Sequence, residues 1–80
     1  MRLDKFLKVS RIIKRRSVAN EVAGAGRVTI NGKEAKPAAD VKAGDVLEIR
    51  FGANTSKYEI LRISETVRKD EAADMYRQLT

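Results

Sequence analysis

Apolar and basic positions in the first sixteen residues recur with the period of an α-helix. An apolar arc on a helical wheel faces a basic arc: Leu3, Phe6, Leu7 and Ile13 against Lys5, Lys8, Arg11 and Arg15. Asp4 falls in the expected first turn, where a carboxylate favours the positive end of the helix dipole. The pattern predicts an amphipathic helix with a basic face.

A second short helix is expected directly after the basic triplet at 14–16. Ser17 is a plausible N-cap, and Gly24 or Gly26 can adopt the left-handed conformation of a helix end. The basic turn between the two helices would place Arg15 and Arg16 beside the first amides of the second helix. Amide donors, the helix dipole and the side-chain charges together predict a phosphate-binding site.

From Arg27 onward the pattern changes to the period of two that is typical of strands. A strand over 27–30 precedes Asn31-Gly32, a strong hairpin signal, and a return strand begins at Lys33 and ends before Pro37. A turn at 43–45 and a polar loop at 52–56 bound further strands. These strands are expected at 46–51 and 57–63.

The C-terminal segment has the spacing of a last short helix, with Asp70 as its N-cap. One face of this helix would carry Ala72, Met75, Tyr76 and Leu79, and we expect this face to pack in the core. Tyr58 and Tyr76 have the aromatic rings on which nucleic-acid bases stack, although no pattern places either beside the basic segment.

Positive charge is concentrated at one end of this 80-residue chain. The 17 Lys+Arg and 11 Asp+Glu residues give a net charge of +6, and residues 1–16, with seven basic side chains and one acidic, account for all of it. A solvated helix face usually mixes both signs, and this one does not. The asymmetry indicates a polyanionic partner, with nucleic acid favoured over an acidic membrane surface.

Composition narrows the possible functions. A hydrophobic fraction of 42% is typical of a folded domain, and no apolar stretch has the roughly 20 residues of a membrane span. Cys and His are both absent, which removes the commonest nucleophile, general base and metal ligands. We therefore expect a cytoplasmic protein with no enzymatic activity, no cofactor and no metal site.

Four spaced motifs together resemble the S4 RNA-binding domain over about Met1 to Phe51. They are Arg2-Leu3-Asp4-Lys5-Phe6-Leu7, Arg16-Ser17-Val18-Ala19, Gly26-Arg27-Val28-Thr29-Ile30-Asn31-Gly32 and Gly44-Asp45. The resemblance implies an α+β fold in which two short helices pack on a small, curled, mainly antiparallel sheet. This order of elements agrees with the patterns above, and we expect one domain over 1–80 with a C-terminal strand and helix within 57–79.

Within that family, the chain resembles the bacterial fifteen-kilodalton heat-shock protein and its small relative in ribosome-associated quality control. Those proteins bind large ribosomal subunits that still hold a peptidyl-tRNA, contact ribosomal RNA and tRNA, and support alanine tailing by a partner protein. The resemblance implies an RNA-binding, non-catalytic, ribosome-associated translation factor, and we expect the chain to be a monomer. Position 20 is often basic in the family, so Asn20 predicts a weaker phosphate contact from the second helix.

The candidate RNA-binding residues are the exposed basic positions and one hydroxyl: Arg2, Lys5, Lys8, Arg11, Lys14, Arg15, Arg16, Ser17, Arg27, Lys33 and Lys36. Lys33 and Lys36 are equally well explained as exposed turn lysines. An RNA-targeting appendage of an RNA-modifying enzyme and a general binder of structured RNA stay open as alternatives. A DNA-binding helix-turn-helix is disfavoured, because the second helix offers only Asn20 and Glu21 as polar readers.

Overall fold

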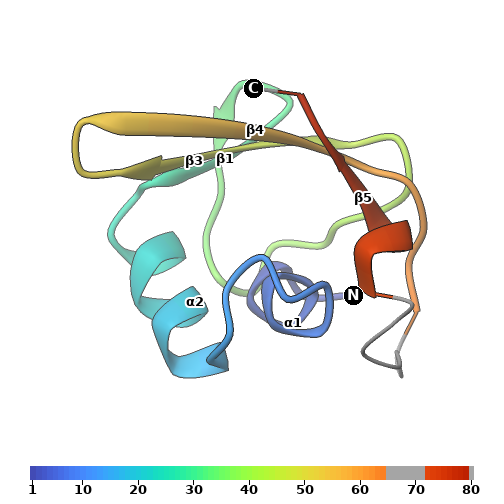
Figure 1. Ribbon diagram of the computed structural model, residues 1–80. Coiled ribbons are helices and arrows are strands. Elements are labelled where there is room, and N and C mark those ends of the chain that lie inside the picture. The colour runs from blue at the N-terminus through green and yellow to red at the C-terminus, as the bar shows by residue number, and fades with distance from the viewer. Residues whose placement is uncertain (65–71, 80) are drawn as a thin grey trace.

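Two helices cover one face of an antiparallel sheet in the computed structural model, which describes residues 1–64 and 72–79 (Figure 1). The elements in chain order are α1 (Leu3–Val9), α2 (Arg16–Gly24), β1 (Val28–Ile30), β2 (Lys33–Glu34), β3 (Val46–Phe51), β4 (Asn54–Ile60), the 3-10 helix η1 (Ala72–Met75) and β5 (Tyr76–Gln78). The strand order is β2-β1-β3-β4-β5, with every neighbouring pair antiparallel. The predicted α+β architecture is confirmed.

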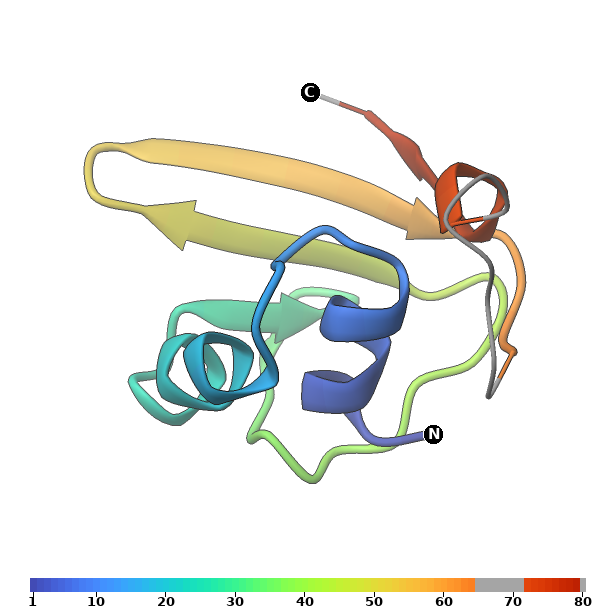
Figure 2. The same cartoon turned by 60° about the horizontal axis from the view of Figure 1, so that its bottom comes forward.

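Both helices face the same side of the sheet (Figure 2), and the buried core side chains come from the helices and the sheet. The buried side chains of the core come from every layer: Leu3, Phe6, Leu7, Ile13, Ala19, Ala23, Val28, Leu47, Ile49, Ile60 and Met75. Phe6 is the largest fully buried side chain, and burying an aliphatic or aromatic side chain of this size contributes about 1.5–3 kcal/mol. The apolar arc predicted for the first sixteen residues is buried in full, and it fixes how α1 lies on the sheet.

The first helix is shorter than predicted, because α1 ends at Val9 and the chain turns through residues 10–15. The buried Ser10 hydroxyl donates to the Leu7 carbonyl at 3.3 Å, which offers the backbone an alternative to the next helical turn. Arg11 then adopts a left-handed φ of 63°. Ile13 still reaches the core, so the apolar period alone did not distinguish this turn from a longer helix.

The second helix also begins two residues earlier than predicted, because its N-cap is Arg15 and not Ser17. Arg15 is the N-cap, in extended conformation, and no side-chain cap is present, so Ser17 lies in the first turn of α2. The early start places Arg16 at the first helical position, from which its guanidinium reaches α1. The end of α2 at Gly24 agrees with the prediction, and Gly26 follows it with φ of +76°.

The hairpin between β1 and β2 is confirmed, with positive φ at both Asn31 (52°) and Gly32 (85°). The Asn31 side chain also ties the hairpin to the start of β3. Its amide nitrogen donates to Asp45 at 3.0 Å, and its amide oxygen accepts from the Val46 backbone at 2.9 Å. The sheet register at β3 is therefore fixed by side-chain as well as backbone bonds.

The predicted polar loop at 52–56 is wrong, because β3 and β4 are joined by two residues only. Phe51 pairs with Asn54, so Thr55 and Ser56 belong to β4. Both side chains are polar, but they stand near the exposed end of a hairpin where polarity does not oppose a strand. The same strand ends at Ile60 and not at 63, since the Leu61 and Arg62 amides donate to the Met75 carbonyl.

The predicted C-terminal helix is replaced by one 3-10 turn followed by a strand. Tyr76–Gln78 forms β5 and pairs with β4, which satisfies an edge that would otherwise be unpaired. Ala72 and Met75 are buried as expected, whereas Leu79 is 43% exposed. The expected cap Asp70 lies outside the described residues. Tyr76 contacts Tyr58 edge to face, with ring centroids 5.4 Å apart.

Candidate nucleic-acid interface

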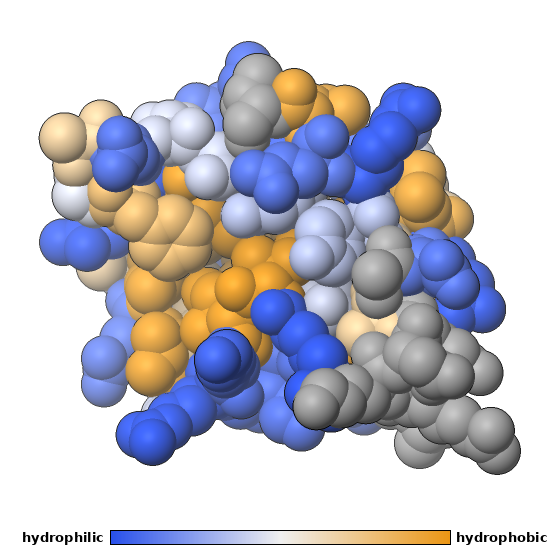
Figure 3. All heavy atoms as spheres, viewed as in Figure 1, coloured by the Kyte–Doolittle hydropathy of each residue, from blue (hydrophilic) through white to orange (hydrophobic). Residues whose placement is uncertain are grey.

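The predicted basic residues at the start of the chain lie on α1, on the turn at 10–15 and at the first position of α2. We call this set the N-terminal basic surface: Arg2, Lys5, Lys8, Arg11, Lys14, Arg15, Arg16 and Ser17. All of them are exposed except the half-buried Lys5. In the space-filling view, hydrophilic side chains gather along the lower edge, over the two helices, next to an apolar area below the sheet (Figure 3).

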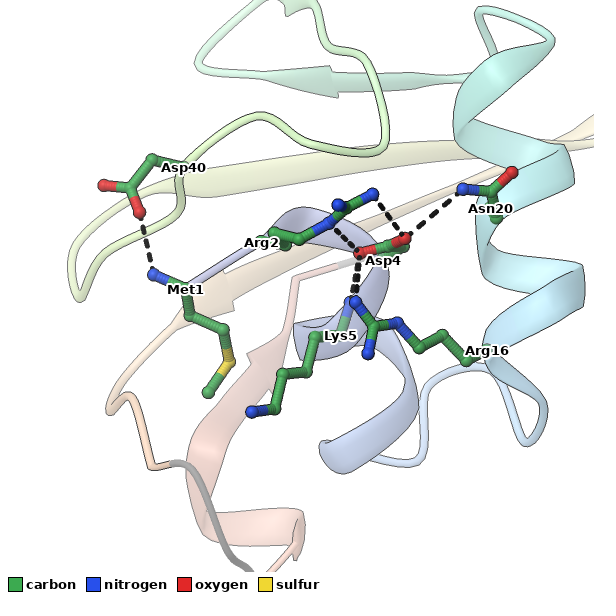
Figure 4. Close-up of polar contacts among 7 residues, drawn as sticks. All are labelled: Met1, Arg2, Asp4, Lys5, Arg16, Asn20 and Asp40. Carbon is green, nitrogen blue, oxygen red and sulfur yellow. Dashed lines mark hydrogen bonds and ion pairs between the residues drawn. The ribbon is translucent and has the colours of Figure 1, made fainter.

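A single buried carboxylate joins the starts of the two helices. The Asp4 side chain is 3% exposed and accepts hydrogen bonds from Arg2 Nε at 3.1 Å and Arg2 Nη2 at 3.2 Å. It also accepts from Arg16 Nη2 at 3.5 Å and Asn20 Nδ2 at 3.3 Å, both of which come from α2. The four residues Arg2, Asp4, Arg16 and Asn20 form the Asp4 cluster (Figure 4).

The Asp4 cluster keeps its carboxylate ionised. Burial favours the neutral acid and by itself would raise the pKa of Asp4. Hydrogen bonds from Arg2 and Asn20 and the charges of Arg16 and Arg2 outweigh burial, so the pKa of Asp4 lies below the ordinary aspartate value of 3.8. At neutral pH a buried anion therefore lies between two arginines that are each about half exposed (50% and 49%).

Four cations of the N-terminal basic surface have no acidic partner in residues 1–64 and 72–79. They are Lys8, Arg11, Lys14 and Arg15. Three of them stand on the turn between the helices, next to the start of α2. Because no side chain caps α2, its first amides are left to the solvent side of the same turn. The turn thus combines positive side chains with free backbone donors, which is chemistry that suits phosphate oxygens.

The backbone of residues 37–39 accepts hydrogen bonds from the start of α1. The amides of Leu3 and Asp4 donate to the carbonyls of Ala39 (2.8 Å) and Pro37 (3.1 Å), so the first amides of α1 are occupied. The N-terminal ammonium of Met1 donates to Asp40 at 2.7 Å, and this hydrogen bond, together with the ammonium charge, lowers the pKa of Asp40 (Figure 4).

The remaining predicted RNA-binding residues are placed differently. Arg27 follows the end of α2, whereas Arg16 begins it, and the nine-residue helix between them is about 13 Å long. Lys33 is exposed on β2, and no hydrogen bond or ion pair links it to the helices within the described part of the chain. Lys36 is next to the segment that contacts α1, and its amine lies 3.5 Å from Glu34. The structure gathers the residues up to Ser17 around the helical pair and leaves Arg27 apart from them.

Sequence reasoning missed the supporting roles of Asp4 and Asn20. It assigned Asp4 to the helix dipole and treated Asn20 as a lost phosphate contact, whereas Asn20 donates to the buried carboxylate. The available signal was a lone acid inside a strongly basic segment. Its partners at positions 16 and 20 lie on another helix, so their contact follows from packing and not from spacing.

The described residues hold neither a membrane-spanning helix nor a metal-binding group of side chains. In the described residues, no helix has the length and apolar character that crossing a membrane requires. The same part of the chain holds no group of three or more side chains arranged to bind a metal ion.

Known proteins resemble this chain in sequence and in fold. The sequence profile of the S4 domain matches residues 1–47. The chain is 55% identical to the RQC P-site tRNA stabilizing factor of Bacillus subtilis and 58% identical to that of Halalkalibacterium halodurans. Each alignment spans 76 residues, which is 95% of this chain and 88% or 86% of the relative.

A solved structure shares the fold over nearly the whole chain. The trimeric structure of Vibrio cholerae heat shock protein 15 superposes with a TM-score of 0.88 at 36% identity. The superposition covers 99% of this chain and 81% of that one.

Proposed function

Because this chain belongs to the S4 domain family, we propose that it is an RNA-binding factor of ribosome-associated quality control that stabilises a tRNA in the P site. The observation that carries the proposal is identity above 50% over 95% of the chain to proteins named for that role. The exposed cations and the folded helical pair supply a physical basis for binding a polyanion.

In this proposal the N-terminal basic surface contacts RNA phosphates. Lys8, Lys14 and Arg15 have no acidic partner among the described residues, so their charges are available to replace the counterions of an RNA backbone. The Asp4 cluster adds two half-exposed guanidinium groups at a defined spacing. The protein acts by holding its RNA partners in place and catalyses no reaction.

The finer parts of the proposal concern its partners. We assign large-subunit ribosomal RNA and the peptidyl-tRNA to the basic surface, and the alanine-tailing protein to the same subunit as a neighbour. The supporting observation is the concentration of uncompensated charge on one side of a small fold, which leaves the outer face of the sheet nearly balanced in charge. Glu48 and Lys57 are paired across that face, as are Glu59 and Arg77.

Gradient sedimentation tests the proposal in cells. The chain, tagged at its C-terminal end so that the Met1–Asp40 contact is preserved, replaces the relative in Bacillus subtilis. We expect it to sediment with large subunits that retain tRNA, and C-terminal alanine tails to be restored. Recovery in the top fractions alone at low salt would contradict the proposal. A modified nucleotide that depends on this chain alone would contradict its non-catalytic part.

A further inference from the structure

The Asp4 carboxylate has more partners than a simple surface ion pair. Its Oδ1 accepts from Arg2, from the Lys5 amide at 2.8 Å and from Arg16, and its Oδ2 accepts from Arg2 and Asn20. These donors come from both helices, up to sixteen residues away in sequence. The two arginine side chains are thereby held by one carboxylate, although Arg2 precedes α1 and Arg16 begins α2.

Most of the donors on the two arginines remain available. A guanidinium has five N–H groups, of which Asp4 occupies two on Arg2 and one on Arg16. About half of each arginine side chain is exposed, whereas Asp4 is buried behind them. An incoming phosphate can therefore reach the arginines but makes no direct approach to the carboxylate.

We propose that Asp4 is a positioning residue for RNA binding: it orients Arg2 and Arg16 so that their free donors meet phosphates of one RNA together. The proposal rests on the proposed function, since it assigns these arginines to the RNA interface. Its physical basis is that an arginine already held in its bound rotamer loses less conformational entropy on binding. Asp4 therefore strengthens binding to a polyanion although its own charge is negative.

This proposal and a purely electrostatic account predict opposite effects of Asp4→Asn on the affinity for RNA. Asp4→Asn raises the net charge of the protein by one from +6, which by charge alone favours RNA binding. Asn keeps the size of the side chain but offers one acceptor oxygen where the carboxylate has two. If positioning dominates, the variant binds RNA roughly tenfold more weakly, which corresponds to releasing two ordered arginine side chains.

The test is a set of anisotropy titrations of labelled protein with purified large ribosomal subunits and with bulk tRNA. Asp4→Asn is measured alone, combined with Arg16→Ala, and combined with Arg15→Ala as the matched control of equal charge. We expect Asp4→Asn to lower the RNA affinity about tenfold in the wild-type protein and in the Arg15→Ala variant. In the Arg16→Ala variant we expect Asp4→Asn to lower it by about threefold or less, because one of the oriented arginines is already absent. All variants are titrated well below their melting temperatures, so that each is fully folded and a loss of affinity does not reflect unfolding.

Several outcomes are decisive. Binding by Asp4→Asn that equals or exceeds wild type, or an undiminished tenfold loss with Arg16→Ala, overturns the proposal. Wild-type protein that binds neither subunits nor tRNA overturns the proposed function and this inference with it. If circular dichroism shows Asp4→Asn unfolded, Asn20→Ala replaces it in the same cycle, with an expected two- to threefold loss that disappears with Arg16→Ala. Persistence of that loss overturns the positioning role.

Discussion

The Asp4 cluster predicts that two pairs of basic residues with equal charge differ sharply in their effect on stability. Replacing Arg2 and Arg16 by Ala leaves an ionised carboxylate buried, with the Lys5 amide and Asn20 as its remaining partners among the described residues. Replacing Lys8 and Arg15 by Ala removes two cations that have no acidic partner among the described residues. Both changes lower the net charge by two, so general charge effects cancel in the comparison.

The magnitude follows from the geometry of the Asp4 cluster. Three hydrogen bonds from arginine to a carboxylate are lost, each contributing about 1.5–3 kcal/mol when well formed. The Arg16 bond is long, at 3.5 Å, and both arginines are half exposed, which reduces the total through solvent screening. We expect the free energy of unfolding to fall by about 2–4 kcal/mol, against a change within about 0.5 kcal/mol for the control pair.

Thermal melts followed by circular dichroism measure this difference. For a domain of this size 1 kcal/mol corresponds to a shift in Tm of about 4–8 °C, so the Arg2/Arg16 variant should melt roughly 8–32 °C lower than wild type. The Lys8/Arg15 variant should melt within a few degrees of it. Equal shifts for the two variants would refute the conclusion that Asp4 depends on its arginine partners.

Two further predictions concern the same helical pair. Because the pKa of Asp4 is lowered in the folded state, the ionised carboxylate stabilises the fold fully above the ordinary value of 3.8, and this stabilisation is lost as the pH falls through the lower folded-state pKa. Urea titrations should therefore show the unfolding free energies of wild type and Asp4→Asn converging as the pH falls below about 4. A difference in unfolding free energy that stays constant from pH 7 to pH 2 would exclude this linkage. Gly26→Ala should destabilise the fold by roughly 1–2 kcal/mol, because Gly26 has a left-handed φ of +76° that an L side chain rarely adopts. Gly24→Ala, in the last turn of α2, should be neutral or slightly stabilising. Similar melting temperatures for the two variants would contradict the left-handed end of α2.

The sequence was most informative where local chemistry determines conformation. Asn31-Gly32 predicted a turn that requires positive φ at both residues, and the alternation from Val46 to Phe51 predicted a half-buried strand. The end of α2 at Gly24 followed from the same reasoning. At these positions the conformational preference of a few neighbouring residues decides the outcome.

Prediction failed where packing between distant segments overrides local preference. The helical spacing of Ala72, Met75 and Tyr76 was real, but pairing with the edge of β4 drew Tyr76 into a strand. The early end of α1 depended on the buried Ser10 and on a left-handed Arg11, which periodicity does not report. For the candidate site, the sequence located the basic segment but not the carboxylate that joins its two helices.

The central claim is that the N-terminal basic surface binds RNA, and the salt dependence of binding tests it most directly. We compare the triple variant Lys8→Ala, Lys14→Ala and Arg15→Ala with a control triple of the same composition, Lys42→Ala, Lys57→Ala and Arg62→Ala. All six side chains are exposed. Arg11 is left unchanged, so that each triple removes two lysines and one arginine.

Anisotropy titrations of large ribosomal subunits and of tRNA at several salt concentrations give the slope of log affinity against log salt concentration. Each phosphate contact contributes about 0.7–0.9 to that slope. We predict that the basic-surface triple lowers the slope by about 2 to 3 and weakens binding, whereas the control triple leaves the slope within about 0.5 of wild type. An unchanged slope in the basic-surface triple, or an equal reduction in the control, would show that RNA binds elsewhere on the protein.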